Sequence, residues 1–266
     1  MLEDITPVVL TFNEAPNIGR TLSRLGWARD IVVVDSFSDD ETVSIARGFP
    51  QVRLCQRAFT GQADQWNYAV SETGIRTEWI LALDADFMVG EALVEELRTL
   101  RPDLKTTGFR CHFTYCIHGR PLRASLLPPM TVLFRRVGAG YRQDGHTQRI
   151  LLEGEVRTLR SRMEHDDRKP LRRWLLTQEG YMTQEAEKLS STPWTRLSWP
   201  DRIRRWGPVA PVGALVYAYL IRGGVLDGRA GLHYALQRLL AEGLLSLKLV
   251  ERLVRTDASP PPMSRG

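Results

Sequence analysis

The chain has 266 residues, of which 43% are hydrophobic and 25% charged, an ordinary globular composition that suits one large domain or one domain with an appendage. An odd number of cysteines argues against a disulfide framework, and no apolar run reaches the about 20 residues of a membrane-spanning helix. The acidic start also lacks the basic segment of a secretory signal.

The charge is unevenly divided along the chain. Residues 1–104 hold 9 basic and 17 acidic side chains, whereas residues 105–266 hold 27 basic and 14 acidic ones. Two parts of opposite sign predict two different tasks. The basic part suits an anionic partner such as phosphate or an anionic lipid surface.

The first part alternates short apolar runs with amphipathic segments. Strands are predicted at residues 8–10, 31–34, 52–54 and 79–83, and helices at residues 18–25, from Ser38, at 62–70 and at 93–100. The unbroken β-branched run at 31–34 is typical of a parallel strand buried on both faces. Ser38 and Glu41 match a capping box that would open the second helix. This alternation predicts an α/β fold with a mostly parallel sheet.

The second part begins with a looser pattern. Strands are predicted at residues 109–117 and 132–136, and residues 148–152 and 155–159 are predicted to form a hairpin around Gly154. A helix is expected at residues 171–189. A last long helix is marked by a leucine face, comprising Leu232, Leu236, Leu239, Leu240, Leu244 and Leu247. Residues 257–266 are predicted to be disordered.

Three of the predicted strands end in polar side chains. These are Thr11, Asn13 and Glu14 after the first strand, Asp35 after the second, and the pair Asp84 and Asp86 after the fourth. On a parallel sheet these groups meet at the carboxyl edge, where ligands of α/β proteins bind. The site has many carboxylates and no glycine-rich phosphate loop, so a phosphate ligand would require a bridging divalent cation.

These motifs together resemble family 2 glycosyltransferases with the GT-A fold. The resemblance is carried by "VVLTFNEAPNIGRTLSRLGWARDIVVVDSFSDDETVSIA", "FTGQADQWNYAV" and "EWILALDADF", and more weakly by "VLFRR", "EHDDRKPLRRWL" and "YLIRGGVLDGRAGLHYAL". The bacterial branch that includes lipopolysaccharide-core glucosyltransferases is the most similar. The resemblance implies a mostly parallel mixed sheet flanked by helices, followed by a C-terminal helical region that associates with membrane. It divides the chain into a nucleotide-sugar half (1–104), an acceptor half (105–170), a basic amphipathic helical region (171–256) and the tail.

The resemblance also implies roles for individual residues. Phe12 would lie against the nucleotide base, Asn13 and Glu14 near the ribose, and Asp35 would accept a hydrogen bond from the base. Asp86 would bind Mg²⁺ or Mn²⁺, Asp84 would face the ribose or the metal, and His165 would be a further metal ligand. The remaining donor-side residues would be Thr11, Gln62, Gln65 and Asn67.

The catalytic base departs from the family pattern. Relatives commonly place a glutamate after a Val-His pair, whereas this chain has Gly145, His146 and Thr147. Asp144 or His146 would then take the proton of the acceptor hydroxyl. Alternatively no base is needed because the acceptor is an anion such as a lipid phosphate. A turn at Asp144 and Gly145 is the non-catalytic alternative.

The predicted function is inverting transfer of a sugar from a nucleotide-sugar, with UDP favoured over GDP, to a lipid-linked or cell-envelope polysaccharide acceptor. The basic region, in which arginines alternate with Trp, Tyr and leucine, suits a peripheral position on the cytoplasmic face of the inner membrane, without nucleic acid as a partner. An ordinary helical subdomain that packs its leucines on the core is the alternative for this region. Rival functions are a polyprenyl-phosphate glycosyltransferase, a sugar-nucleotide pyrophosphorylase and a non-catalytic membrane-surface binding protein.

Overall fold

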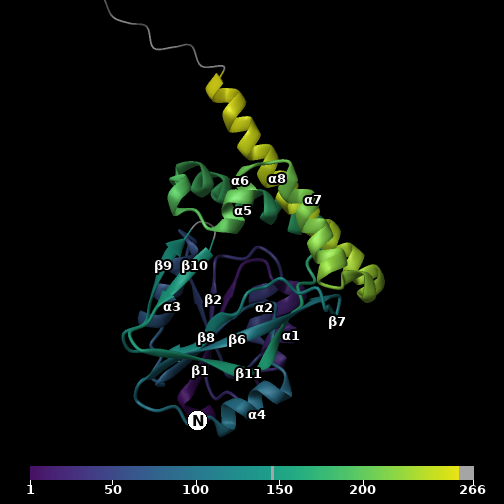
Figure 1. Cartoon of the computed structure of the whole chain (residues 1–266). Helices are drawn as coiled ribbons and strands as arrows, with labels where there is room; N and C mark the ends of the chain where they lie inside the picture. The colour runs from purple at the N-terminus through teal and green to yellow at the C-terminus, as the bar shows by residue number, and fades with distance from the viewer. Residues whose placement is uncertain (145–146, 258–266) are drawn as a thin grey trace, which may run out of the picture. The chain divides into compact units, whose positions relative to one another are not determined.

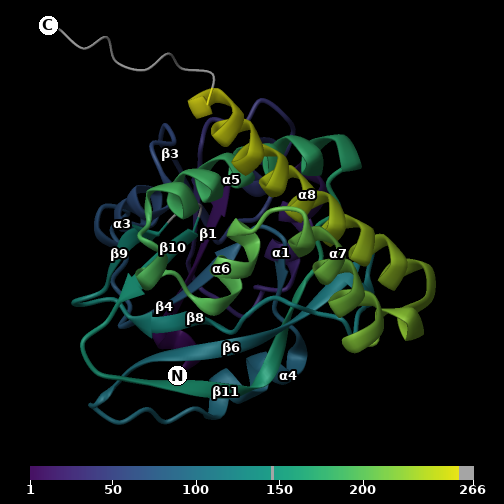
Figure 2. The ribbon, with the colours of Figure 1, turned by 45° about the horizontal axis from the view of Figure 1, so that its top comes forward.

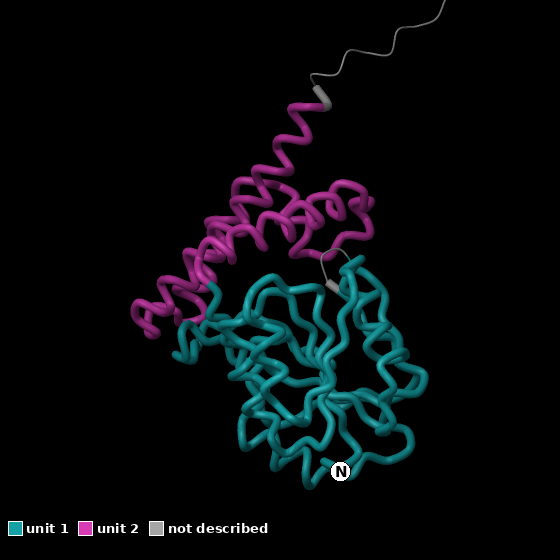
Figure 3. Tube along the Cα trace, turned by 180° about the vertical axis from the view of Figure 1, so that it is seen from behind, with its two compact units in different colours: residues 1–169 teal, residues 170–266 magenta. Residues whose placement is uncertain are grey.

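A computed structural model describes residues 1–144 and 147–257. The chain forms two compact units, Met1–Lys169 and Pro170–Gly266 (Figure 3). The first unit holds the mixed α/β layers and the second holds helices (Figure 1). The predicted division of the first unit at residue 104 stays a prediction.

Unit 1 follows the predicted alternation of strands and helices. Its helices are η1 (Leu2–Asp4), α1 (Ala15–Ser23), α2 (Thr42–Arg47), α3 (Gln62–Ser71) and α4 (Glu91–Thr99). Its strands are β1 (Ile5–Thr11), β2 (Ile31–Asp35), β3 (Val52–Gln56), β4 (Trp79–Asp84), β5 (Phe87–Met88), β6 (Thr106–Ile117), β7 (Arg120–Pro121), β8 (Met130–Arg135), β9 (Gly140–Asp144), β10 (Thr147–Leu151) and β11 (Glu155–His165).

The main sheet has the strand order β3-β2-β1-β4-β8-β6-β11-β5. Strands β3, β2, β1 and β4 run parallel, β8 is antiparallel to both of its neighbours, and β11 is parallel to β6. The predicted α/β architecture, a mixed, mostly parallel sheet with helices and a C-terminal helical region, is confirmed. Its parallel half places the ends of β1, β2 and β4 at one edge.

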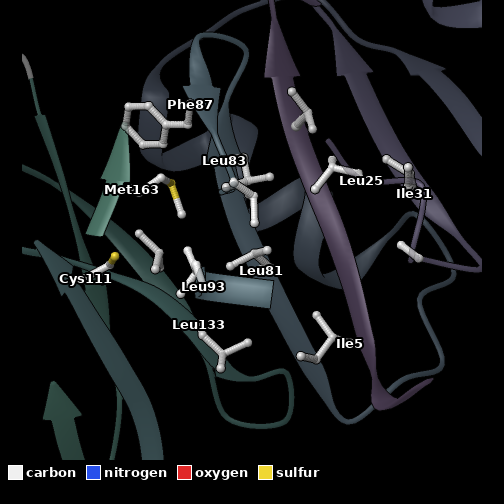
Figure 4. Packing of buried hydrophobic residues seen from close by; sticks show 14 of the residues in the cluster. Ile5, Leu25, Ile31, Leu81, Leu83, Phe87, Leu93, Cys111, Leu133 and Met163 are labelled. Carbon is white, nitrogen blue, oxygen red and sulfur yellow. The ribbon is translucent and has the colours of Figure 1, made fainter. Parts of the chain in front are cut away.

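The parallel strands bury both of their faces, as the β-branched runs predict. Successive residues of β1 enter different cores: Val9 packs with Leu81 and Leu83 on one face, whereas Val8 packs on the other face. Leu22 of α1, Leu25 after it and Leu93 of α4 pack on the first face; Leu25 and Leu93 are labelled in Figure 4. Trp66 and its neighbours on α3 cover the second. Such two-sided burial fixes the strand register, because a one-residue slip would exchange the two faces.

The predicted hairpin around Gly154 is wrong. Strand β10 pairs with β9, and β11 leaves to pair in parallel with β6. Gly154 lies against that strand rather than in a hairpin turn, since a Cβ added to it would approach Thr107 Cγ2 at 2.4 Å. Apolar and polar residues alternate in both segments, as they do in the strands of a hairpin. This pattern does not show whether a strand pairs with its neighbour in sequence or with a distant strand.

Unit 2 consists of helices, in accordance with the predicted helical region. Its elements are α5 (Leu171–Ser191), η2 (Trp194–Arg196), α6 (Trp199–Arg205), α7 (Val209–Val216), η3 (Tyr217–Ile221), η4 (Gly224–Asp227) and α8 (Gly228–Asp257). Helix α7 runs beside α8, and α5 also packs on α8 (Figure 2). A buried ion pair between Arg204 and Glu185 links α6 to α5 at 2.9 Å, and Arg204 also binds Glu242 of α8 at 3.0 Å.

Most of the predicted leucine face of the last helix lies outside the core of unit 2, although Leu244 packs against a buried cluster. Leu232, Leu236 and Leu240 are 42–48% exposed, whereas the buried face of α8 carries Ala235, Ala241 and Leu245. Small residues on the buried face let the neighbouring helices approach closely, and larger side chains are left outside. Leu245 and Leu249 nevertheless lie in a buried cluster, and Leu244 packs against it, so the alternative of a helical subdomain that packs its leucines inward stays open.

No single helix among the described residues is long and apolar enough to cross a bilayer. One bent pair, Val209–Ile221 with Gly224–Arg255, passes the same test together, with an angle of 68° between its halves. The three cysteines, Cys55, Cys111 and Cys116, are free thiols.

Candidate active site

The carboxyl edge of the parallel strands gathers the polar strand ends. In the sheet register Thr11 stands opposite Asp35, and Leu10 stands opposite Asp84. The chain therefore leaves β1, β2 and β4 at the same level, and the side chains that follow each strand line one edge. The predicted convergence at a single edge is observed.

Asp35 is fully buried and organises the loops at this edge. One of its carboxylate oxygens accepts hydrogen bonds from the hydroxyls of Thr11, at 3.0 Å, and Ser38. The other accepts from the Ser38 amide at 2.9 Å and from Gln56 Nε2 at 3.2 Å. Four donors fill the acceptor capacity of the carboxylate. A base N–H could bind Asp35 only by displacing one of them.

The capping-box interpretation of Ser38 is wrong. Its hydroxyl donates to Asp35 and accepts from the Asn13 amide at 2.8 Å, so it joins the two loops instead of capping a helix. Glu41 is the N-cap residue of α2, and Asp40 accepts from the Thr42 amide at 2.9 Å. The residues that match a cap in the sequence instead make a contact between two loops that only the folded chain brings together.

Two exposed aromatic rings flank this network. Phe12 follows β1 and is 51% exposed, and Phe37 follows β2 and is 57% exposed. Phe37 has a φ of 60°, a backbone conformation that bulky residues rarely adopt and that often marks functional sites. Asn13, with a φ of 55°, is held in place by its side-chain oxygen, which accepts from the Asp39 amide. The rings offer a surface for a nucleotide base, and the sequence-based prediction missed Phe37.

Asp86 and His165 are brought together by strand pairing. Strand β5 follows Asp86 directly and pairs with the end of β11, with His165 opposite Phe87. The Asp166 amide donates to the Asp86 carbonyl at 3.0 Å, and His165 Nε2 lies 3.4 Å from Asp86 Oδ2. The two residues predicted to share a metal are therefore neighbours, although they are far apart in sequence.

Both members of this pair have an unpaired buried atom. Asp86 Oδ1 and His165 Nδ1 are shielded from solvent and have no hydrogen-bond partner among the described residues. Burial without a partner costs free energy, which a bound cation would recover at the carboxylate. Burial and the nearby Asp86 charge raise the pKa of Asp84 to about 6. This excess of negative charge suits a divalent cation.

The residues present fit such a cation in part. Asp86 and His165 would hold it, Asp84 lies close enough to interact electrostatically with both, and donor phosphate oxygens and water would supply the other ligands. Among residues 1–144 and 147–257 no group of three or more Asp, Glu, His or Cys side chains is already arranged around a common point. When bound, the cation would neutralise the charge that develops on the departing phosphate.

Glu14 forms a buried ion pair with Lys169, which the sequence-based prediction missed. Lys169 Nζ donates to Glu14 Oε1 at 2.6 Å, and Asn17 donates to the other Glu14 oxygen at 2.9 Å. Burial, partly offset by Lys169, raises the pKa of Glu14 to about 7. Burial lowers the pKa of Lys169, but the charges of Glu14, Asp86 and Asp167 outweigh this effect and raise it. The Lys169 ammonium thus offsets part of the negative charge at the acidic edge.

The segment after β11 is tied to α1 by a second set of polar contacts. Asp166 is 2% exposed and binds Arg20, the Gly119 amide at 2.9 Å and Arg168 Nε at 3.0 Å. The fully buried Asn17 side chain accepts from the Arg168 amide at 3.0 Å. These contacts hold His165 and Lys169 at the edge. The only sequence signal for them was the charged run that includes "HDDRK".

The donor-side amides have different environments. Gln65 is buried, donates to Ser36 Oγ at 3.1 Å and keeps a buried Oε1 without a partner among the described residues. Asn67 instead pairs with the backbone of Tyr141 on β9, at 3.0 and 2.7 Å. Gln62 opens α3 and is partly buried. The structure therefore gives Asn67 a structural role and leaves Gln65 near the end of β2.

One candidate base, Asp144, lies at the end of β9. Asp144 ends β9 opposite Thr147, and its Oδ2 forms an ion pair with Arg149 Nε at 2.5 Å. His146 lies outside the described residues. An acceptor hydroxyl would have to compete with Arg149 for the Asp144 carboxylate.

The family model of Glycosyl transferase family 2 matches residues 7–115, which include the polar ends of β1, β2 and β4. Over these residues the chain is similar to family 2 glycosyltransferases. An uncharacterized glycosyltransferase of Rickettsia bellii is 32% identical over 98 residues, which are 36% of this chain and 32% of the relative. One of Rickettsia felis is 31% identical over 97 residues, which are 36% of this chain and 33% of the relative. The chain spans about a third of the length of these curated relatives.

Two solved structures show a weaker likeness to this chain. S. aureus TarS 1-349 in complex with UDP-GlcNAc has a TM-score of 0.48 and 13% identity, covering 95% of this chain and 92% of that one. Glucosyl-3-phosphoglycerate synthase from Mycobacterium tuberculosis, in complex with Mn²⁺, UDP and glucosyl-3-phosphoglycerate, has a TM-score of 0.33 and 17% identity, covering 42% of this chain and 44% of that one.

Proposed function

We propose that the protein transfers a sugar, with inversion, from a nucleotide-sugar to a lipid-linked or cell-envelope glycan acceptor. The observation that carries this proposal is the pair Asp86 and His165, set at the carboxyl edge of a family 2 region with one unpaired buried atom on each residue. A Mg²⁺ or Mn²⁺ ion held there would receive the donor diphosphate. The exposed rings of Phe12 and Phe37 would take the base, and a UDP-sugar is the donor we favour over a GDP-sugar.

The proposed acceptor step depends on Asp144. In inverting transfer a carboxylate removes the proton of the acceptor hydroxyl as that oxygen attacks the anomeric carbon, while the nucleoside diphosphate leaves. We assign this role to Asp144, which must leave its ion pair with Arg149 to act. Replacing Asp144 by Asn is then expected to lower turnover at least about a hundredfold.

A second candidate function is transfer to a polyprenyl phosphate. The 2.5 Å ion pair between Asp144 and Arg149 favours it, because a carboxylate that is already paired is a poor proton acceptor and an anionic acceptor needs none. Under this alternative, Asp144→Asn retains nearly full turnover. Lipid phosphates and neutral lipid-linked sugars, assayed side by side with both variants, distinguish the two acceptor classes.

For the location, we propose the cytoplasmic face of the inner membrane, with unit 2 on an anionic lipid surface. The branch of lipopolysaccharide-core glucosyltransferases is the proposed subgroup, which would place the acceptor in the envelope. A non-catalytic membrane-surface protein is the rival of another class. It would have no need for a buried carboxylate and histidine with unpaired atoms at a sheet edge.

The test is a panel of UDP- and GDP-sugars incubated with the full chain and Mn²⁺, with release of the nucleoside diphosphate as the readout. Release that requires the metal and stops in EDTA supports the proposal. Absence of any metal-dependent binding or release across the panel would support the non-catalytic rival. The panel also identifies the donor, which the acceptor assays then use.

A further inference from the structure

Unit 2 exposes a mostly apolar segment, residues 206–226, here termed the apolar hairpin, in which Arg222 is the one charged residue. Its large apolar side chains are between 40% and 72% exposed: Trp206, Val209, Val212, Val216, Tyr217, Leu220, Ile221, Val225 and Leu226. Residues 207–221 include no charged side chain. Contiguous exposed apolar surface of this kind marks a binding surface rather than ordinary solvent-facing helix.

The apolar hairpin is held in a defined shape. The small residues Ala210 and Ala218 are buried on the side of α7 and η3 that packs on α8. The turn that follows depends on glycines. A Cβ on Gly231 would meet the Gly224 carbonyl oxygen at 1.9 Å, and Gly223 has a φ of 80°. Because the close-packed side uses small residues, the bulky side chains remain on the outside, and Ile221 and Leu226 are each 68% exposed near the turn.

Arginines precede the apolar hairpin, lie at its turn and follow it. Arg202 and Arg205 precede it and lie over the Trp194 ring, at 5.8 and 6.0 Å from its centre. Arg222 and Arg229, both exposed, lie at and beyond the turn. Apolar side chains bordered by arginine and tryptophan match the acyl layer and headgroup layer of a membrane in order.

We propose that the apolar hairpin inserts into one leaflet of a bilayer that carries anionic headgroups. The 13 residues of Val209–Ile221 span about 20 Å as a helix, less than the about 30 Å of a hydrocarbon core, so the segment enters the membrane without crossing it. The inference deepens the membrane location proposed above by naming the inserting surface. It does not rest on the transfer reaction.

The test is flotation of the full chain with vesicles of phosphatidylcholine, alone or mixed with phosphatidylglycerol. The unaltered chain is expected to bind the mixed vesicles. Ile221→Glu with Leu226→Glu should weaken that binding at least about tenfold, because each carboxylate would enter the acyl layer. Arg222→Gln with Arg229→Gln should reduce binding about fivefold per arginine on mixed vesicles only. Leu104→Glu is the matched control, since Leu104 is 92% exposed and lies in unit 1.

UDP binding in the presence of Mn²⁺, measured on the same preparations, separates this inference from the proposed function. The Ile221 and Leu226 variant should bind UDP like the unaltered chain, which also shows that unit 1 is folded. Equal flotation of this variant and the unaltered chain, or no flotation of either, would overturn the inference. Sedimentation velocity tests the alternative that the apolar hairpin binds a second copy of the chain. A dimer that the Ile221 and Leu226 substitutions dissociate would overturn the inference and make this segment a protein interface.

Discussion

The two units use apolar residues in opposite ways. In unit 1 the apolar strand residues are buried on both sheet faces, and the exposed positions at the carboxyl edge are polar or aromatic. In unit 2 the buried positions of α7 and α8 are often alanines, and valines and leucines lie outside. A hydrophobic pattern therefore predicts burial reliably only where a second layer covers it, and elsewhere it indicates a surface that awaits a partner.

The polar residues differ in the same way. Unit 1 concentrates buried charge at one edge, where Asp86 is 7% exposed and Glu14 is paired with Lys169. Unit 2 uses its one deeply buried carboxylate among the described residues, Glu185, to join helices through Arg204. Buried charge in unit 1 has unpaired atoms beside it, whereas the Arg204 network in unit 2 is closed by carboxylates on three sides. The first arrangement suits ligand binding and the second suits stability.

Removing the carboxylate of Asp86 should have the largest effect in either unit. Asp86→Asn is expected to lower turnover about a thousandfold, about 4 kcal/mol, since one of the two residues proposed to hold the cation loses its charge. Steady-state release of UDP measures it. Glu72→Gln, an exposed carboxylate at the end of α3, is the matched control and should leave turnover unchanged.

Loss of the Lys169 ammonium should destabilise unit 1. Lys169→Met leaves Glu14 and Asp86 without their cation and is expected to cost about 3 kcal/mol at about pH 8, by analogy with other broken buried pairs. At about pH 5 the loss should be smaller, because Glu14 is then protonated. Urea unfolding at both pH values measures this difference, with the exposed Lys105→Met as control. An equal loss at both values would contradict the assigned pairing.

The raised pKa values of the edge carboxylates predict a pH-dependent stability. The folded chain binds protons at Glu14 and Asp84 more tightly than the unfolded chain, with pKa values of about 7 and about 6. The free energy of unfolding without metal should therefore fall by roughly 2 kcal/mol as pH rises from about 5.5 to about 7. Glu14→Gln should flatten this fall. A free energy of unfolding that rises over the same window would show that the edge is not desolvated.

The exposed tryptophans of unit 2 should contribute least to stability. Trp199 and Trp206 are 73% and 72% exposed, so Trp199→Ser or Trp206→Ser is expected to change the free energy of unfolding by less than about 0.5 kcal/mol. Thermal unfolding without vesicles measures it. A loss of several kcal/mol would mean that these rings are packed and would weaken the contrast between the units.

The strand positions and the shared edge could be predicted because each rests on local patterns. Unbroken β-branched runs mark two-sided burial, and polar side chains after each run meet once the strands are parallel. The pairing of Asp86 with His165 needed the β5–β11 contact, and the role of Lys169 needed the chain path after β11. The predictions of a hairpin around Gly154 and of a helix cap at Ser38 were wrong, because in each case the residues bind a segment that is distant in the sequence.

The most direct test of the central claim is the ligand set of a bound Mn²⁺ ion. Pulsed electron paramagnetic resonance of the full chain with Mn²⁺ and UDP should show coupling to ³¹P of the diphosphate and to a histidine nitrogen that is absent in His165→Gln. Phosphorus coupling with no protein nitrogen, or a nitrogen signal that survives His165→Gln, would contradict the assignment of Asp86 and His165 as the residues that hold the donor's cation.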